Sequence, residues 1–110
     1  MRAAAIGIGS NSLRMLVADI QDAQLRRIHR DREGLRVFAA LDANGNIAPA
    51  MMDQACASVG AMARKAQDME AETIHLFATS AVRDARNRKE FGEALYHATG
   101  LKLDVCTGEL

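Results

Sequence analysis

Residues 3–20 read AAAIGIGSNSLRMLVADI, and this stretch decides how the chain begins to fold. An apolar run, residues 3–8, leads into the small residues 9–12, and a second apolar run, residues 13–20, follows at once. The pattern predicts a strand, a tight turn and a second strand. Glycine allows a sharp turn and a close approach to a ligand, and Ser10, Asn11 and Ser12 offer donors to phosphate oxygens. An ordinary hairpin explains the run equally simply, and short glycine motifs often match by chance, so the run alone favours the hairpin.

The following residues extend this start into a larger sheet and a helix. Residues 21–24 are a plausible turn into a third strand that begins with residues 25–29, so successive hairpins open the domain. Residues 42–46 form a turn cluster, and a helix with Pro49 in its first turn is expected after it. Seven apolar residues recur at helical spacing and predict the buried face of this helix: Met52, Ala55, Cys56, Val59, Met62, Ala63 and Ala66.

The second half of the chain alternates strand and helix. Residues 73–79 read as a central strand, and residues 101–107 as a last strand. Between them, Asn87 and Glu90 fit a capping box, and Gly100 ends the helix that follows. The apolar face of that helix is expected to consist of Phe91, Ala94, Leu95 and Ala98. The order is βββαβαβ, which predicts an α/β fold with a mixed five-stranded sheet: three antiparallel strands, then two strands parallel to the first.

Composition and charge exclude several classes of protein. The chain has 110 residues, enough for one small domain or a piece of a larger one. Lys+Arg 14 balances Asp+Glu 14, so no global charge directs the chain to nucleic acid or to a membrane. Two segments are locally basic: Arg26, Arg27, Arg30, Arg32 and Arg36 in the first, and Arg83, Arg86, Arg88 and Lys89 in the second. A solvent-exposed surface is the simpler explanation of these clusters, and a binding site for a polyanion is the more specific one.

The cysteines and histidines show no pattern of a metal or disulfide site. Cys56 and Cys106 are far apart, and His29, His75 and His97 lack ligand spacing. No apolar run approaches the roughly 20 residues that span a membrane. We therefore expect a cytoplasmic protein without membrane or nucleic-acid partners.

A second motif, residues 78–85 (ATSAVRDA), couples the end of a strand to hydroxyl groups and an arginine. If a helix begins here, its free N–H groups attract phosphate, and Arg83 can donate two hydrogen bonds to phosphate oxygens. Alternatively, Thr79 or Ser80 caps the helix and Arg83 pairs with a carboxylate. The motif alone does not separate these interpretations.

Taken together, residues 9–14, residues 78–85 and Asn87 resemble the exopolyphosphatase and guanosine pentaphosphate phosphatase (Ppx/GppA) family. The segments 32–36, 41–45, 101–105 and 107–109 follow the same family arrangement. The resemblance implies a ribonuclease H-like (actin-like ATPase) fold of two lobes, with residues 1–110 as the N-terminal part of the first lobe and the second lobe absent. It also implies a homodimeric, magnesium-dependent hydrolase that removes terminal phosphate from inorganic polyphosphate or guanosine pentaphosphate.

Carried over by position, the resemblance assigns the phosphate-binding residues. They are Gly9, Ser10, Asn11, Ser12, Arg14, Thr79, Ser80 and Arg83. Arg14 fits an ion pair on the face of a strand equally well.

The chain departs from the family pattern at two places. Gly7 stands where the family has an aspartate that helps to position the metal and the attacking water. The general-base glutamate is expected at or just beyond Leu110, and Glu109 is close to it without being that residue. We therefore expect these 110 residues alone to be inactive. A non-catalytic phosphate- or nucleotide-binding module, or a pseudoenzyme, is the alternative, while the motif at residues 79–85 argues against a lobe of a sugar or acetate kinase.

Overall fold

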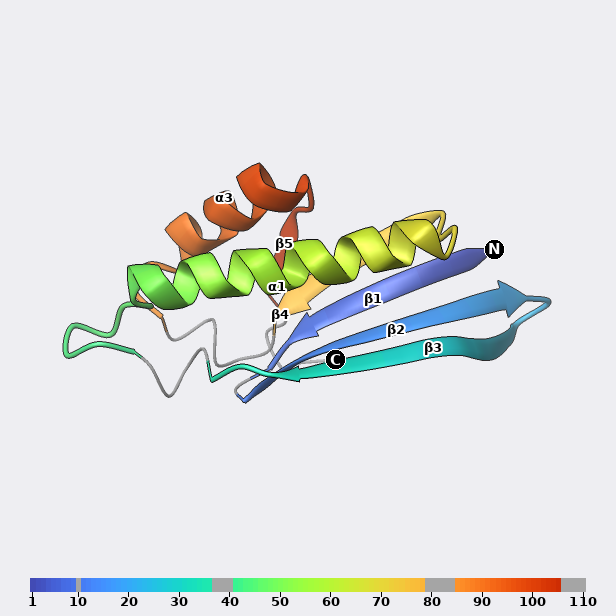
Figure 1. The fold of residues 1–110 in the computed structure, drawn as a ribbon, viewed down its shortest axis with the longest axis horizontal. Coiled ribbons are helices and arrows are strands. Elements are labelled where there is room, and N and C mark those ends of the chain that lie inside the picture. The colour runs from blue at the N-terminus through green and yellow to red at the C-terminus, as the bar shows by residue number, and fades with distance from the viewer. Residues whose placement is uncertain (10, 37–40, 79–84, 106–110) are drawn as a thin grey trace.

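A mixed five-stranded sheet carries two helices on one of its faces (Figure 1). The computed structural model describes residues 1–9, 11–36, 41–78 and 85–105. The elements are β1 (Arg2–Ile8), β2 (Ser12–Gln21), β3 (Gln24–Gly34), α1 (Pro49–Asp68), β4 (Thr73–Ala78), α3 (Arg88–Thr99) and β5 (Leu103–Val105). Their order confirms the predicted succession, although the last strand begins two residues later than expected.

The strands lie in the order β3-β2-β1-β4-β5. β1, β2 and β3 are antiparallel neighbours, and β4 and β5 run parallel to β1, as predicted. The β2–β3 hairpin closes through Asp22 and Ala23, which both have positive φ, 52° and 63°. Such a turn matches the right-handed twist of the two strands. The parallel pairing of β1 with β4 places the C-terminal ends of these two strands side by side.

A bulge interrupts the pairing of β2 with β3. Val17 pairs with His29, but Ala18 pairs with Arg27, so Ile28 has no partner in the register. Ile28 packs against the core, and His29 lies opposite the buried Val17. Two consecutive residues of β3 therefore face the helices, which places Arg27 and Arg30 on the opposite face although they are three residues apart.

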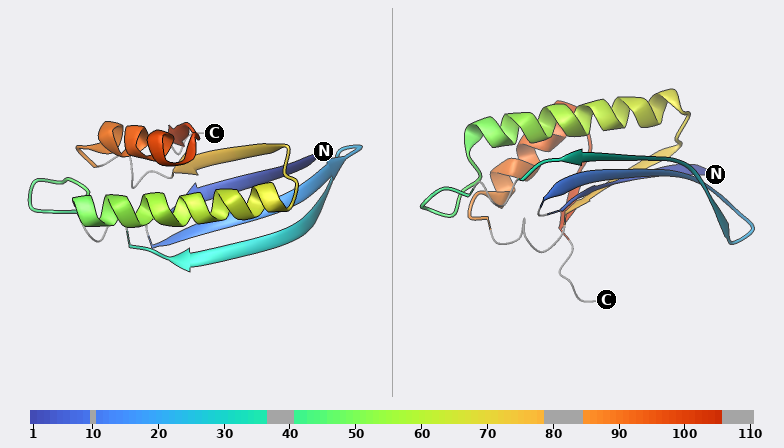
Figure 2. Two further views of the ribbon diagram at one scale, coloured as in Figure 1. Left: turned by 45° about the horizontal axis from the view of Figure 1, so that its top comes forward. Right: turned by 60° about the horizontal axis from the view of Figure 1, so that its bottom comes forward.

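The core lies between the sheet and the helices (Figure 2). Buried residues alternate along β1 (Ala4, Ile6 and Ile8) and along β2 (Leu13, Met15 and Val17), as expected for strands with one covered face, and Ser12 and Ala18 of β2 are buried as well. The predicted face of α1 is confirmed, with five residues buried (Ala55, Val59, Met62, Ala63 and Ala66) and Met52 and Cys56 packed against them. Pro49 occupies the first turn of α1, as expected.

The start of α3 differs from the prediction. Asn87 occupies the N-cap position, but its side chain makes no capping hydrogen bond. Its Oδ1 accepts the backbone N–H of Ile47 at 2.8 Å, and its Nδ2 donates to the carbonyl oxygen of Ile47 at 2.9 Å. The predicted capping box is therefore wrong, because Asn87 holds the loop before α1 instead. On the apolar face, Phe91 and Leu95 are buried, whereas Ala98 is exposed, contrary to expectation.

Gly100 ends α3 as predicted, with φ of 75° and its N–H donating to the carbonyl oxygen of Tyr96. We expect Gly100→Ala to lower the free energy of unfolding by about 1–2 kcal/mol, because an L side chain is strained in the left-handed region. Gly92, inside α3 with open space around its Cβ position, is the matched control. Gly92→Ala should raise stability by about 0.5–1 kcal/mol. Urea denaturation measures the free energy of unfolding of both variants. Equal effects of the two substitutions would contradict a left-handed conformation at Gly100.

Three side chains outside the candidate site, those of Arg2, Asp19 and Cys56, have shifted pKa values. The hydrogen bond from Arg2 holds the pKa of Asp19 below its ordinary value, and this pair stabilises the folded chain until acid protonates Asp19. Partial burial, with a smaller contribution from Asp53, raises the pKa of the Cys56 thiol, which disfavours its thiolate form. No helix in the described part of the chain is long and apolar enough to cross a membrane.

Candidate phosphate-binding site

The sheet face opposite the helices carries a groove of about 1000 Å³ beside the turn between β1 and β2. We call this side of the sheet the open face and define it by Ala5, Gly7, Arg14, Leu16 and Phe77. In β1, β2 and β4 these residues alternate with buried ones that pack under the helices. The groove is lined by Ala5, Gly7, Gly9, Asn11, Ser12, Arg14, Met15, Leu16, Arg27, Arg30, Asp31, Arg32 and Phe77.

The turn that follows β1 lies at one end of this groove. The N–H of Gly9 donates to the carbonyl oxygen of Ser12 at 2.8 Å, which closes the turn and uses the Gly9 amide within it. The carbonyl oxygen of Asn11 accepts the N–H of Leu35 at 3.1 Å, so the turn is tied to the end of β3. Asn11 is exposed, whereas Ser12 is only 7% exposed. The turn thus presents Asn11 more fully than Ser12 to a ligand.

The second motif begins where β4 ends, next to the first. Ile8, the last residue of β1, pairs with Ala78, the last residue of β4, in the parallel ladder. The two motifs therefore leave neighbouring strands at the same edge of the sheet, the position where ligands of such sheets bind. Ser10, Thr79, Ser80 and Arg83 lie outside the described residues, as do Glu109 and Leu110, so their predicted roles stay predictions.

Arg14 extends from β2 on the open face, next to the turn. It lies opposite Gly7 of β1 and opposite Arg32 of β3. Arg14 lines the groove and is exposed. In the described part of the chain the ion pairs join Arg2 to Asp19, Lys65 to Asp31 and His75 to Asp104, and none includes Arg14. The structure therefore favours a guanidinium available to an anion over the ion pair on the strand face.

Gly7 lies beneath the ring of Phe77. The two residues pair across β1 and β4, and a Cβ atom at position 7 would lie 2.7 Å from Cζ and 2.9 Å from Cε2 of Phe77. The ring of Phe77 also stacks with His75, with 5.6 Å between the ring centroids and 23° between the planes. A side chain at position 7 is thus excluded unless the aromatic ring moves.

The resemblance implies a magnesium ion, but residue 7 is a glycine and offers no side chain that could bind it. Glycine has no side chain, and Phe77 fills the space in which a side chain would begin. Within residues 1–9, 11–36, 41–78 and 85–105, no three His, Cys, Asp or Glu side chains group closely enough to hold a metal ion. The described residues therefore do not fit a metal site in this groove.

The sequence did not reveal two features of the groove. In the sequence, Phe77 was only part of an expected central strand, and its position over Gly7 depends on the register of β1 with β4. The arginines of β3 were recognised as a basic cluster, but the bulge decides that Arg27 and Arg30 line the same groove as Arg14. In the sequence, the glycine-rich turn, the motif at residues 78–85 and the clusters of arginines were the signals that pointed to an anion.

Comparison with known proteins gives a consistent result. The model of the Ppx/GppA phosphatase family matches residues 16–110. Exopolyphosphatase 2 of Mycobacterium tuberculosis is 34% identical over 113 aligned positions, which cover 99% of this chain and 35% of that protein. Guanosine-5'-triphosphate,3'-diphosphate pyrophosphatase of Vibrio cholerae is 31% identical over 106 positions, covering 96% of this chain and 21% of that protein.

The fold agrees with these sequence matches. The crystal structure of the Aquifex aeolicus member of the Ppx/GppA family superimposes with a TM-score of 0.92 at 28% identity, over 99% of this chain and 36% of that one. The chain thus spans between about a fifth and about a third of the length of these relatives. The predicted actin-like, ribonuclease H-like α/β fold is confirmed. From the family match and the fold, this chain belongs to the Ppx/GppA phosphatase family.

Proposed function

We propose that this chain contributes a phosphate-binding lobe to a hydrolase that cleaves terminal phosphoanhydride bonds of inorganic polyphosphate or guanosine pentaphosphate. The observation that carries the proposal is the edge of the sheet where β1 and β4 end together, with the turn at residues 9–12 and Arg14 beside it. The names of the relatives support this substrate class, since one is an exopolyphosphatase and another acts on guanosine-5'-triphosphate,3'-diphosphate.

In this proposal the described residues bind and orient the phosphate chain. The guanidinium of Arg14 donates hydrogen bonds to non-bridging phosphate oxygens, and the exposed side chain of Asn11 supplies a neutral donor. Arg83 adds a second guanidinium from the neighbouring motif. Such donors stabilise negative charge on the equatorial oxygens during in-line attack by water. Magnesium is not assigned a ligand here, because Gly7 supplies none. Homodimerisation and a cytoplasmic location remain predictions.

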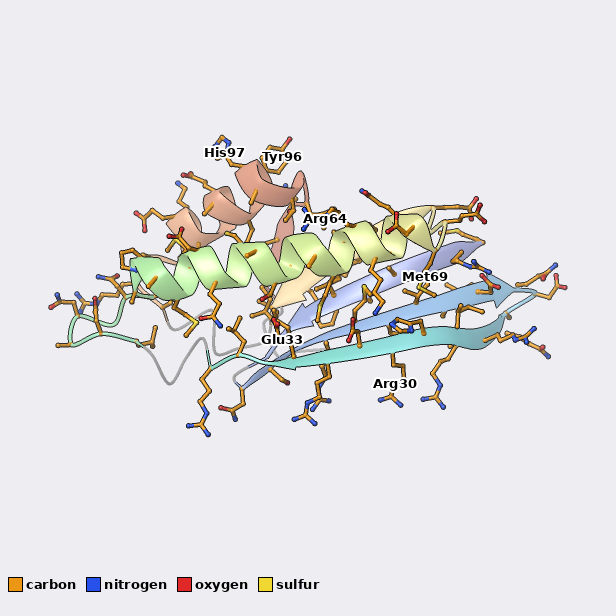
Figure 3. The ribbon with its side chains drawn as sticks, viewed as in Figure 1. Arg30, Glu33, Arg64, Met69, Tyr96 and His97 are labelled. Atoms are coloured by element: carbon orange, nitrogen blue, oxygen red, sulfur yellow. The ribbon has the colours of Figure 1, made fainter. Side chains whose placement is uncertain are left out.

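Binding of tripolyphosphate to the 110-residue chain tests the proposed site. We expect Arg14→Gln to weaken binding by about tenfold, since charge-assisted hydrogen bonds contribute about 1.5–3 kcal/mol each. Arg64→Gln, which removes the same charge from α1 on the helical side of the sheet, should leave binding unchanged (Figure 3). Isothermal titration calorimetry measures both. If Arg14→Gln bound tripolyphosphate as tightly as the unmodified chain, Arg14 would not be part of the binding site.

A non-catalytic phosphate-binding module is the second candidate, and Gly7 favours it. The position expected to hold a carboxylate is a glycine with Phe77 over it, so in this second proposal position 7 supplies no group that positions water. Release of phosphate from polyphosphate separates the two functions. Turnover in the protein that carries this lobe supports the hydrolase, whereas tight binding without turnover supports the module.

A further inference from the structure

The loop that precedes α1 is closed by its own hydrogen bonds. Within residues 41–47, Leu41 and Ile47 form an isolated antiparallel bridge. The N–H of Asp42 donates to the carbonyl oxygen of Asn46 at 2.8 Å, and the Oδ1 atom of Asp42 accepts the N–H of Asn46 at 3.0 Å. We call residues 41–47 the clamp loop. These contacts fix its backbone, so the loop can support another segment of the chain.

Three hydrogen bonds tie the clamp loop to the two residues before α3. The N–H of Arg86 donates to the carbonyl oxygen of Gly45 at 2.9 Å. The carboxamide of Asn87 accepts the N–H of Ile47 at 2.8 Å and donates to the carbonyl oxygen of Ile47 at 2.9 Å. Because Ile47 is buried, its backbone groups depend on these bonds for partners. The backbone at Arg86 and Asn87 is therefore fixed against a loop that lies about 40 residues earlier in the chain.

The clamp loop holds the chain directly after the second motif, residues 78–85. The motif begins at Ala78, which is buried and pairs with Ile8 in the parallel ladder of β4 with β1. It ends at Ala85, which is buried and immediately precedes the first hydrogen bond to the clamp loop. Both ends of the motif are thus attached to the core, the first through the sheet and the second through the clamp loop.

The contacts of Asn87 point to a role other than capping α3. Asn87 occupies the N-cap position but makes no capping hydrogen bond. The oxygen and the nitrogen of its side chain are both bonded to the clamp loop instead. Arg83, which the proposed function places on phosphate, lies four residues before Asn87 in the sequence. A binding group contributes most when its surroundings hold it in place before the ligand arrives.

We propose that Asn87 is a positioning residue for Arg83, and that its two hydrogen bonds to Ile47 hold the second motif in the conformation that binds phosphate. This inference rests on the proposed function, which assigns Arg83 to phosphate binding. In this arrangement Asn87 does not itself contact the phosphate. Loss of its carboxamide therefore weakens binding only through Arg83.

A double-mutant cycle on the binding of tripolyphosphate tests the proposal, with isothermal titration calorimetry as the measurement. We expect Arg83→Gln to weaken binding by about tenfold, because a charge-assisted hydrogen bond is lost. Asn87→Ser should weaken binding by about fivefold, because Arg83 must then be ordered as the ligand binds. The double variant should bind as tightly as Arg83→Gln alone, since a positioning residue has no effect once the residue that it positions is gone. An equal loss from Asn87→Ser with and without Arg83 would overturn the proposal.

Gly100→Ala is the matched control for stability. This substitution strains the other end of α3 and leaves the clamp loop unchanged. It should destabilise the chain to an extent comparable to Asn87→Ser, but the affinity for tripolyphosphate should stay the same. Circular dichroism at the temperature of the titration verifies that both variants are folded. If Gly100→Ala weakened binding as much as Asn87→Ser does, general destabilisation would explain the loss and the proposal would fail.

Gly45 allows a second test that leaves Asn87 in place. Its φ is 80°, a conformation that strains alanine and that asparagine adopts more readily. A Cβ atom at position 45 would lie 3.6 Å from Cγ of Arg86, an ordinary contact, so a substitution acts through the backbone. Gly45→Ala should therefore weaken the binding of tripolyphosphate, as Asn87→Ser does, whereas Gly45→Asn should bind nearly as tightly as the unmodified chain. If Gly45→Ala destabilised the chain without weakening binding, the clamp loop would have no effect on the site and the proposal would be overturned.

The outcomes separate this inference from the proposed function. If the unmodified chain does not bind tripolyphosphate, the proposed function fails and the inference fails with it. If Arg83→Gln binds as tightly as the unmodified chain, the inference fails, whereas the part of the proposed function that depends on Arg14 stands. If Arg83→Gln weakens binding and Asn87→Ser does not, only the inference is wrong.

Discussion

Replacing Gly7 with alanine should lower the free energy of unfolding by about 1–3 kcal/mol, the usual effect of forcing extra atoms into a packed site. The new Cβ would lie 2.7 Å from Cζ of Phe77, well inside van der Waals contact. The ring also stacks on the exposed His75, a contact that is lost if the ring turns away. The alanine therefore displaces Phe77 or strains β1 against β4. Urea denaturation monitored by circular dichroism measures the loss.

The control for this variant is Gly34→Ala at the end of β3, where a Cβ atom meets nothing within 4 Å. That substitution should be neutral or slightly stabilising. In a Phe77→Ala background, Gly7→Ala should lose its cost, so a double-mutant cycle should show strong coupling between the two positions. Equal stability of Gly7→Ala and the unmodified chain would mean that the ring does not occupy this space.

Replacing Asn87 with serine should lower the free energy of unfolding by about 2 kcal/mol, although serine is as good an N-cap as asparagine. The Asn87 amide both accepts from and donates to the backbone of Ile47. A serine side chain is too short to make both bonds. The buried Ile47 would then keep backbone groups that have lost their partners, which is more costly than the bonds themselves are worth.

Asn87→Asp sharpens this test. The carboxylate still accepts from the N–H of Ile47, but it places a negative oxygen against the Ile47 carbonyl, so we expect a loss at neutral pH similar to that of serine. If Asn87 acted as a cap, both variants would be as stable as the unmodified chain. Thermal denaturation followed by circular dichroism distinguishes the two outcomes.

The sequence predicted those parts of the fold that depend on local patterns. The alternation of apolar residues in β1 and β2, the position of Pro49 and the left-handed Gly100 each follow from the chemistry of neighbouring residues. Asn87 was misassigned because its partner, Ile47, lies 40 residues away. A cap and a long-range clamp require the same residue type, and local sequence does not separate them.

In the candidate site, too, local features could be predicted from the sequence and long-range contacts could not. The turn at residues 9–12 and Arg14 were identified from their residue types and their position after a strand. The contact of Phe77 with Gly7 depends on the pairing of two strands that are distant in sequence. The shared face of Arg27 and Arg30 depends on a single unpaired residue, Ile28, which reverses the alternation along β3. Neither can be derived from periodicity alone.

The bulge in β3 has a consequence for how two copies of this chain meet. β3 is the outermost strand of the sheet, and its unpaired backbone groups are a template for the addition of another strand. The irregular spacing at Ile28 interrupts that template, and Arg27, Arg30 and Arg32 would add positive charge beside any strand that paired there. The irregularity and charge that shape the groove therefore also protect this sheet against edge-to-edge aggregation.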